Sequence, residues 1–520
     1  MTDSTQYILG QGSQLFIDNS LIEQSDSVTR RWHKPERLQN DPVLVADQPW
    51  EDFPYFTYSN FNVHFDPHDG LVKCWYEDLG PMHPYQTHPW KSRILYAESE
   101  DGIHFRKPDL GIEVDGRPTN IVCGYVEGAE SNKRNPWAHC GVHSTGIVID
   151  PDPTSSSHRY RMLFSRAEET GHGNIECAHS ADGIIWKRDD EPPKYGNAGS
   201  SLGDVSILYY DAPTKLFVHH TRHGSMHHTG QPANWPKQAA GEGGFFPPSY
   251  PLRPDLMNKR RIFRSVSADF ENWTDLAVIC EPTDERDNLD DGFYGMPMFR
   301  AGQHYFGTLG VLHYVDNEMD VRLMQSHDGV HWSDTDNAKP FLKARGEGHW
   351  DRHMVSMTSA PVKFGDRWLF HFGGSLAHHD YWMSGRQKLD HDEARDPAAH
   401  VRFGMGVAEM RFEGIASLEA RKPRLGRIVT RPVRTSGSKV LINARCKPGG
   451  SIRVAVADSV GNILKGRDYD DCVPFDSDAV EHVLSWADGG VWNAGNGPSE
   501  YHKLMFLIDD AELFSFAVRG

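Results

Sequence analysis

One short motif recurs along the first ~420 residues and constrains the fold more than any other feature. It reads Ser, any residue, Asp, usually Gly, two further residues and an aromatic residue. The copies are SEDGIHF (99–105), SADGIIW (180–186), SADFENW (267–273) and SHDGVHW (326–332), with a degenerate fifth copy, MRFEGIASL (410–418). Each copy follows a short β-rich run, and Asp-Gly is a typical tight turn between antiparallel strands. The motif therefore predicts a β-hairpin in each of five repeats.

A second strand pair precedes each hairpin, as in FNVHFDPHDGLVKCWYE and DVSILYYDAPTKLFVHHTR. The motif copies start 59 to 87 residues apart, more than the ~40 to 50 residues of a bare four-stranded unit, so long loops must fill the difference. Unrelated hairpins in a sandwich would not keep the same strand order in every unit. The pattern therefore predicts a five-bladed β-propeller.

The motif stops near residue 425, and the remaining residues read as alternating strands with glycine turns. This tail predicts a β-sandwich. The expected fold class is all-β, with a propeller catalytic domain at residues 1–424 and a β-sandwich domain at 425–520.

Charge and composition exclude some partners. The chain has 54 Lys and Arg against 72 Asp and Glu, a net charge of −18, which disfavours nucleic acid and anionic membrane surfaces. The first residues lack a signal-like pattern, and no run approaches the ~20 apolar residues that span a bilayer. We expect no membrane association and a cytoplasmic location. The seven cysteines have no CxxC spacing, as expected of reduced thiols, and the sequence does not indicate an oligomeric state.

Residues that begin the first strand of a blade share one face with residues that end the second, because the two strands are antiparallel. The long loop Arg222–Lys259 would form part of the rim of that face. The face collects carboxylates, imidazoles and guanidiniums, edged by tryptophans such as Trp350. The residues expected there include Tyr58, Asn60, Glu77, Asp78, His143, Arg166, Asp204, Arg222, His223, Asp291, Tyr294, His313, Asp351, His353, His378 and His379.

Such a mixture suits a sugar, whose hydroxyls need many hydrogen-bonding partners and whose C–H faces stack on aromatic rings. The structural alternative for each residue is that it caps a strand or pairs with a neighbour inside the channel.

The stretches LFIDNSLIE and TRRWHKPERLQNDPVL, with the later WE, are similar to those of a large group of bacterial hydrolase-like proteins. Residues 15–420 resemble the five-bladed propeller superfamily that includes glycoside hydrolase families 32, 43, 68 and 130, and the C-terminal part resembles the sandwich of family 32. The resemblance implies an Asp nucleophile in blade one, an Asp stabiliser and a Glu general acid. It places Asp204 of GDVSILYYD at the stabiliser position. Tyr58 and Asn60 stand where the nucleophile should be, and Gly295 or Met296 where the acid should be.

The first functional hypothesis is a glycoside hydrolase, exo-acting on a small or terminal glycan at the mouth of the channel. Asp204 would be catalytic, with Asp291 and Asp351 replacing the missing carboxylates. The residues expected to bind the carbohydrate are His143, Arg166, Arg222, His223, Tyr294, His353 and Trp350.

Two alternatives remain open. In a polysaccharide lyase, Arg166 or Arg222 would neutralise a uronate carboxylate while His143, His223 or Tyr294 removes the α-proton. The propeller could also bind a glycan without catalysis.

The chain has 29 histidines, and His219, His223, His227 and His228 could gather around a divalent cation. Loop histidines are more often solvated or hydrogen-bonded, and no HExxH-like spacing occurs. We therefore predict no cofactor and no metal ligands, with a divalent metal left as the alternative.

Overall fold

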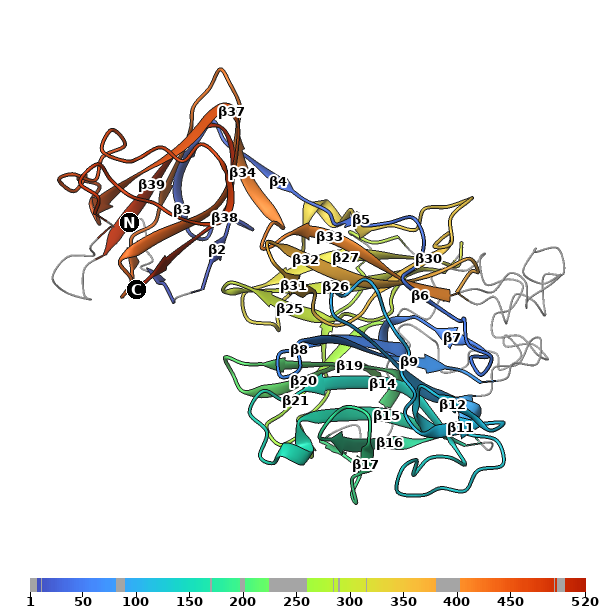
Figure 1. The fold of residues 1–520 in the computed structure, drawn as a ribbon. Helices are drawn as coiled ribbons and strands as arrows, with labels where there is room; N and C mark the ends of the chain where they lie inside the picture. The colour runs from blue at the N-terminus through green and yellow to red at the C-terminus, as the bar shows by residue number, and fades with distance from the viewer. Residues whose placement is uncertain are drawn as a thin grey trace.

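The structure is a computed structural model and describes residues 7–10, 12–80, 89–168, 171–196, 202–223, 260–283, 285–288, 290–314, 316–379, 403–490, 492 and 501–520. Within these ranges the regular elements are β-strands and short 3₁₀ helices, which confirms the all-β class (Figure 1). No helix in the described part of the chain has the length and apolarity needed to cross a membrane. All seven cysteines are free thiols, as expected.

Three separate sheets form the first part of the propeller, and each is a series of antiparallel strands. The first contains β7 (Pro54–Tyr55), β8 (Phe61–Asp66), β9 (Leu71–Asp78), β10 (Arg93–Ser99) and β13 (Ile121–Gly124). The second contains β14 (Gly141–Ile149), β15 (Tyr160–Glu168), β16 (Gly171–Ser180) and β17 (Trp186–Arg188). The third contains β19 (Leu202–Asp211), β20 (Leu216–His223), β21 (Ile262–Ser267) and β23 (Ala277–Cys280).

A twelve-stranded sheet completes the propeller. Its first half is β24 (Asp291–Phe293), β25 (Met298–Ala301), β26 (His304–His313), β27 (Glu318–Ser326), β28 (Ser333–Asp334) and β29 (Pro340–Leu342). Its second half is β30 (Met354–Met357), β31 (Val362–Phe364), β32 (Arg367–Ser375), β33 (Phe403–Arg411), β5 (Glu36–Arg37) and β6 (Leu44–Val45). One parallel pair, Met319 with Met354, joins the halves. Dividing the sheet there gives two units, and the count of five blades stays a prediction.

The smaller elements lie mostly in connections between blade strands. They are η1 (Tyr58–Asn60), η2 (Pro89–Lys91), β11 (Ile112–Val114), β12 (Arg117–Thr119), η3 (Ser156–His158), β18 (Lys194–Tyr195), β22 (Asn272–Trp273) and η7 (Asp336–Ala338).

The repeated motif forms the turn after the third strand of a unit. In the second unit the Ser180 hydroxyl accepts the N–H of Gly183, and one oxygen of Asp182 accepts the next two N–H groups. The motif glycine takes φ near +75°, a conformation that glycine adopts without strain. Phe270 occupies the same place in the third copy at φ 71°. The turn is held by hydrogen bonds between side chains and backbone N–H groups of neighbouring residues, which is why the sequence predicts it well.

These turns also dock one unit on another. The Trp75 indole in the first unit donates to the carbonyl of Gly183 in the second at 2.6 Å. A ring nitrogen of His371 in the last unit lies 2.8 Å from the carbonyl of Gly102 in the first. The last unit therefore contacts the first, as a closed propeller requires, and β5 and β6 from the N-terminal segment pair with β33.

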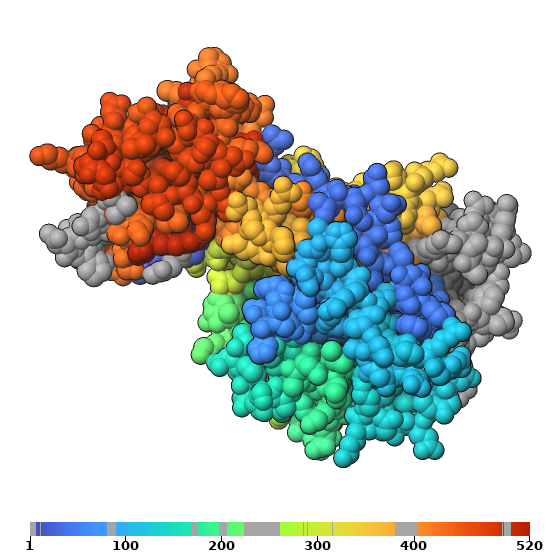
Figure 2. Space-filling view, in the orientation of Figure 1, coloured from blue at the N-terminus to red at the C-terminus, as the bar shows by residue number. Residues whose placement is uncertain are grey.

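The C-terminal lobe is one ten-stranded sheet around its own apolar core. It contains β1 (Tyr7–Ile8), β2 (Gln14–Leu15), β3 (Ile22–Asp26), β4 (Thr29–Trp32), β34 (Ala416–Ala420), β35 (Gly426–Thr430), β36 (Val433–Arg434), β37 (Lys439–Asp458), β38 (Asp478–Val483) and β39 (His502–Arg519). Figures 1 and 2 show this lobe beside the propeller, with the N-terminal segment passing from one to the other.

Strand pairing therefore divides the chain differently from the predicted boundary at residues 424 and 425. Residues 7–32 belong by hydrogen bonding to the C-terminal sheet, because β1 to β4 pair with β34, β35, β36 and β39. The pairing joins segments some 400 residues apart, and no local pattern in the sequence reports it.

Candidate functional site at the channel end

Tyr58 lies where the inner strand of the first unit begins, and it is 1% exposed. Its φ of 22° is in the left-handed region, a strained conformation for a bulky residue and one that concentrates at functional sites. A Cβ on Gly310 would approach the Tyr58 hydroxyl to 2.0 Å, so the ring needs a glycine there. Burial, with Tyr294 and Asp320 nearby, raises the pKa of Tyr58 well above its ordinary value. The phenol is therefore neutral.

A buried carboxylate, Glu77 at the end of β9, lies next to this position. Its side chain is 0% exposed. One oxygen accepts from Nδ1 of His143 at 2.6 Å, and the other accepts from the Asn60 amide at 2.6 Å and the Ser144 N–H at 3.1 Å. A carboxylate that binds one ring nitrogen fixes the tautomer and orientation of the ring, which prepares an imidazole for proton transfer.

The predicted residue His143 therefore lies in a dyad with Glu77. We expected Glu77 on this face but did not predict it as catalytic. The sequence feature that could have indicated Glu77 is a carboxylate near the end of the buried strand Leu71–Asp78. Ser144, at φ 53°, is a second strained residue, and it lies at an irregularity in β14.

Asp291 forms a second carboxylate–imidazole pair at the start of β24. It is 0% exposed and accepts from His313 Nδ1 at 2.8 Å and from the Arg322 guanidinium at 2.8 Å. Although burial opposes the charge, hydrogen bonds to Asp291 and Asp320 raise the pKa of His313 to about 10. Burial also opposes ionisation of Asp291, but the hydrogen bond and charge of His313 lower its pKa. The pair is thus an imidazolium and a carboxylate at neutral pH.

The Tyr294 ring lies among aromatic and cationic side chains at this end of the channel. Its ring centroid is 5.8 Å from that of Tyr58 and 4.9 Å from that of His379. The guanidiniums of Arg222 and Arg260 lie 4.8 and 4.7 Å from the same centroid. The predicted residues Tyr294 and Arg222 therefore meet at this end of the channel.

Arg166 does not join them. Its guanidinium pairs with Glu176 at 3.0 Å and Glu168 at 3.1 Å, and Glu176 also binds Arg188 of the outer strand β17. These ion pairs stabilise the second unit, and the expected role of Arg166 in binding substrate stays a prediction.

Asp351 has a structural environment. It is 0% exposed, and its two oxygens bind Arg37 of β5 at 2.7 Å and Arg345 at 2.6 Å. The neighbouring Trp350 donates to the carbonyl of Asn40 at 2.8 Å and stacks on Phe372. Both residues fasten the N-terminal segment to the last unit. The catalytic role of Asp351 stays a prediction, but its geometry favours this structural role.

His353 lies next to Glu318 and His378 at the rim of the same channel end. Its Nδ1 is 3.0 Å from a Glu318 oxygen, and its ring stacks on that of His378 with centroids 3.7 Å apart. Burial, with the charges of His378 and Arg352, lowers the pKa of His353. The sequence placed both histidines on this face, but not Glu318.

Of the four histidines considered as metal ligands from the sequence, only His219 has a described side chain. Adjacent residues of β20 face opposite ways: His219 Nδ1 lies 2.7 Å from the Tyr195 hydroxyl, and His220 Nδ1 lies 2.7 Å from the Met296 carbonyl. The side chains of Asp204 and His223, and all of His227 and His228, lie outside the described residues. The roles of Asp204 and His223 stay predictions.

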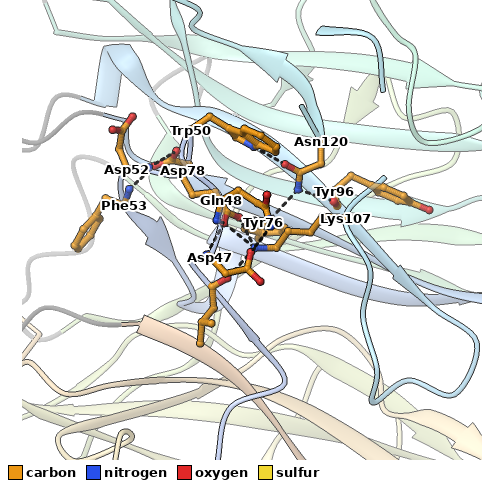
Figure 3. Close-up of polar contacts among 12 residues, drawn as sticks. Asp47, Gln48, Trp50, Asp52, Phe53, Tyr76, Asp78, Tyr96, Lys107 and Asn120 are labelled. Carbon is orange, nitrogen blue, oxygen red and sulfur yellow. Dashed lines mark hydrogen bonds and ion pairs between the residues drawn. The ribbon is translucent and has the colours of Figure 1, made fainter. Parts of the chain in front are cut away.

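The WE motif belongs to a network of polar contacts with the first unit, which Figure 3 draws in part. Both oxygens of Glu51 lie 2.7 Å from the Lys107 ammonium, and one accepts from the Tyr76 hydroxyl at 2.6 Å. The Trp50 indole donates to the Asn120 side chain at 2.8 Å. These contacts clamp residues 47–53 onto the first unit and so fix the segment that leads to Tyr58.

Comparison with protein-family models found no match, and neither did comparison with curated proteins. Solved structures do show a distant likeness. A glycosyl hydrolase from Bacteroides ovatus is 12% identical with a TM-score of 0.42, covering 77% of this chain and 97% of that chain.

A structure from the GH130 family of mannoside phosphorylases, titled for hydrolases that target β-1,2 mannosidic linkages, is 14% identical with a TM-score of 0.42, covering 72% and 94%. An N-acetylgalactosamine deacetylase from F. plautii is 14% identical with a TM-score of 0.39, covering 73% and 96%. At these scores the likeness carries no argument for an activity of this chain.

Proposed function

We propose that this protein is a glycan-active enzyme, a glycoside hydrolase that acts at the channel end around Tyr58. The observation that carries the proposal is the fully buried Glu77, which holds His143 beside a dense set of polar and aromatic groups. Hydroxyl-rich sugars need such convergent donors and acceptors, with ring faces for stacking.

In this proposal His143 moves the proton, because Glu77 fixes its orientation. The imidazolium of His313, held by Asp291, stabilises negative charge that develops near it. Asp204 keeps the role that the sequence resemblance implies, that of the stabilising carboxylate. Exo-action on a terminal sugar remains part of the proposal, as does a carbohydrate partner.

The test is Glu77→Gln, assayed for sugar release from a panel of glycosides and oligosaccharides. Losing the carboxylate removes the group that orients His143, so turnover should fall about 10²- to 10⁴-fold, the usual contribution of acid–base catalysis. Glu98→Gln is the matched control, because Glu98 is a partly buried carboxylate of the same unit that pairs with Arg106. Equal turnover by both variants would refute the proposal, and release of single terminal sugars only would support exo-action.

A uronate lyase is the second candidate, and the two arginines beside the Tyr294 ring favour it, since guanidiniums bind carboxylates well. A lyase would produce an unsaturated sugar that absorbs in the near ultraviolet. If uronate-containing glycans give this absorbance with the wild type but not with Arg222→Met, the protein is a lyase rather than a hydrolase. Its absence on those substrates would rule the lyase out.

A further inference from the structure

Three potential metal ligands meet at the rim of the channel end, and they come from three separate segments. Glu318 begins β27, His353 precedes β30 and His378 follows β32. One ligand atom from each residue lies within 4.8 Å of the other two. We predicted no metal ligands from the sequence, and these three residues are 35 and 25 residues apart along the chain.

Backbone hydrogen bonds tie these segments together close to each ligand. The N–H of Met319, next to Glu318, donates to the carbonyl of His353 at 3.0 Å. His353 in turn donates its N–H to the carbonyl of Ser375 at 3.1 Å. His379, next to His378, donates to the carbonyl of Asn317 at 3.0 Å. The three side chains therefore project from one hydrogen-bonded framework rather than from independent loops, which limits the reorganisation that metal binding would need.

The distances between the ligand atoms are near those of a bound site. Zinc binds imidazole nitrogen and carboxylate oxygen at about 2.0 to 2.2 Å, which places ligand atoms about 3 to 3.6 Å apart. The Glu318 to His353 separation is already 3.0 Å, and the two imidazoles are stacked with 25° between their planes. The stacked rings of His353 and His378 would have to turn so that one nitrogen of each points at the same ion, because the nitrogen lone pairs lie in the ring planes.

We propose that Glu318, His353 and His378 bind a divalent transition-metal ion, with zinc the best fit. Two imidazoles and one carboxylate form a ligand set that suits zinc, and three protein ligands leave at least one coordination position for water or a sugar hydroxyl. The ion would lie beside the proposed active site, since His379 follows His378 and contacts Tyr294. The proposal goes beyond the glycan-active function, because the ion would bind without substrate.

The experiment uses the full chain, stripped with a chelator and titrated calorimetrically with ZnCl₂, and with CaCl₂ as a separate arm. We expect one zinc ion per chain and no comparable calcium binding, because calcium prefers six or more oxygen ligands. His378→Ala should weaken zinc binding by more than about tenfold, since even supporting residues of a zinc site contribute 10- to 100-fold.

His331→Ala is the matched control, because exposed His331 also lies 2.7 Å from a carboxylate, that of Asp328, at the surface. It should bind zinc as the wild type does. Cobalt gives an independent readout, since a tetrahedral site develops visible absorption that His378→Ala should lose. If His378→Ala does not fold, Glu318→Gln replaces it with the same expectation. The proposal would be overturned if the wild-type protein shows no saturable zinc binding. It would also be overturned if the variant and the wild type bind zinc with equal affinity. Neither outcome depends on Glu77, so failure here is distinct from failure of the proposed function.

Discussion

His313 should make the stability of the propeller depend on pH in a defined window. Its pKa is raised from 6.5 to about 10 in the folded chain, chiefly by hydrogen bonds to Asp291 and Asp320 against the effect of burial. A histidine with a raised folded pKa stabilises the protein fully below its unfolded pKa, and the stabilisation disappears as the pH rises through the folded pKa. The window is therefore about pH 6.5 to 10.

Each pH unit inside that window costs about 1.4 kcal/mol, because the folded state retains one proton that the unfolded state has lost. Between pH 7 and pH 9 the His313 contribution to the free energy of unfolding should fall by about 2 to 3 kcal/mol. The assay is urea unfolding followed by tryptophan fluorescence at both pH values.

His313→Asn provides the reference, because the Asn amide can still donate to Asp291 but does not titrate. The difference between wild type and His313→Asn isolates His313, since tyrosines, lysines and cysteines titrate in both proteins. A difference that stays constant from pH 7 to pH 9 would refute the charged pair, and the proposed stabilising role of His313 with it.

Two further predictions concern buried carboxylates that support the site. Asp351→Asn should lower the free energy of unfolding by about 3 to 5 kcal/mol, because it leaves Arg37 and Arg345 without their shared carboxylate. Turnover by the folded variant should stay within a few-fold of wild type. A large loss of turnover at unchanged stability would instead support the catalytic role of Asp351. Lys107→Met should also cost about 3 to 5 kcal/mol, because it leaves the Glu51 carboxylate buried without its cation; a cost under about 1 kcal/mol by chemical unfolding would contradict the clamp that we describe.

The control for these stability measurements is Lys339→Met. Lys339 is 60% exposed and pairs with Asp336 at 3.2 Å. Exposed pairs contribute about 0 to 1 kcal/mol, so this variant should unfold almost as the wild type does.

The sequence by itself determined the repeated turn, the all-β class and the face that carries the polar groups. Each of these depends on local chemistry: Ser180 and Asp182 accept the N–H groups of their own turn, and antiparallel strands place known residues at one end. The sequence could therefore place His143, Tyr294 and Asp291 at the same end of the channel.

Only the tertiary structure decided which carboxylates stabilise the fold and which present an imidazole. Glu77 lies near the end of β9 and Asp351 in the turn before β30. Asp351 contacts Arg37 of a distant N-terminal strand, whereas Glu77 contacts His143 of the next blade. Glu318 lies beside His353 and His378 for the same reason, because the fold brings distant segments of the chain together. The energy of a buried charge depends on the partner that the fold brings to it, and those partners lie tens to hundreds of residues away along the chain.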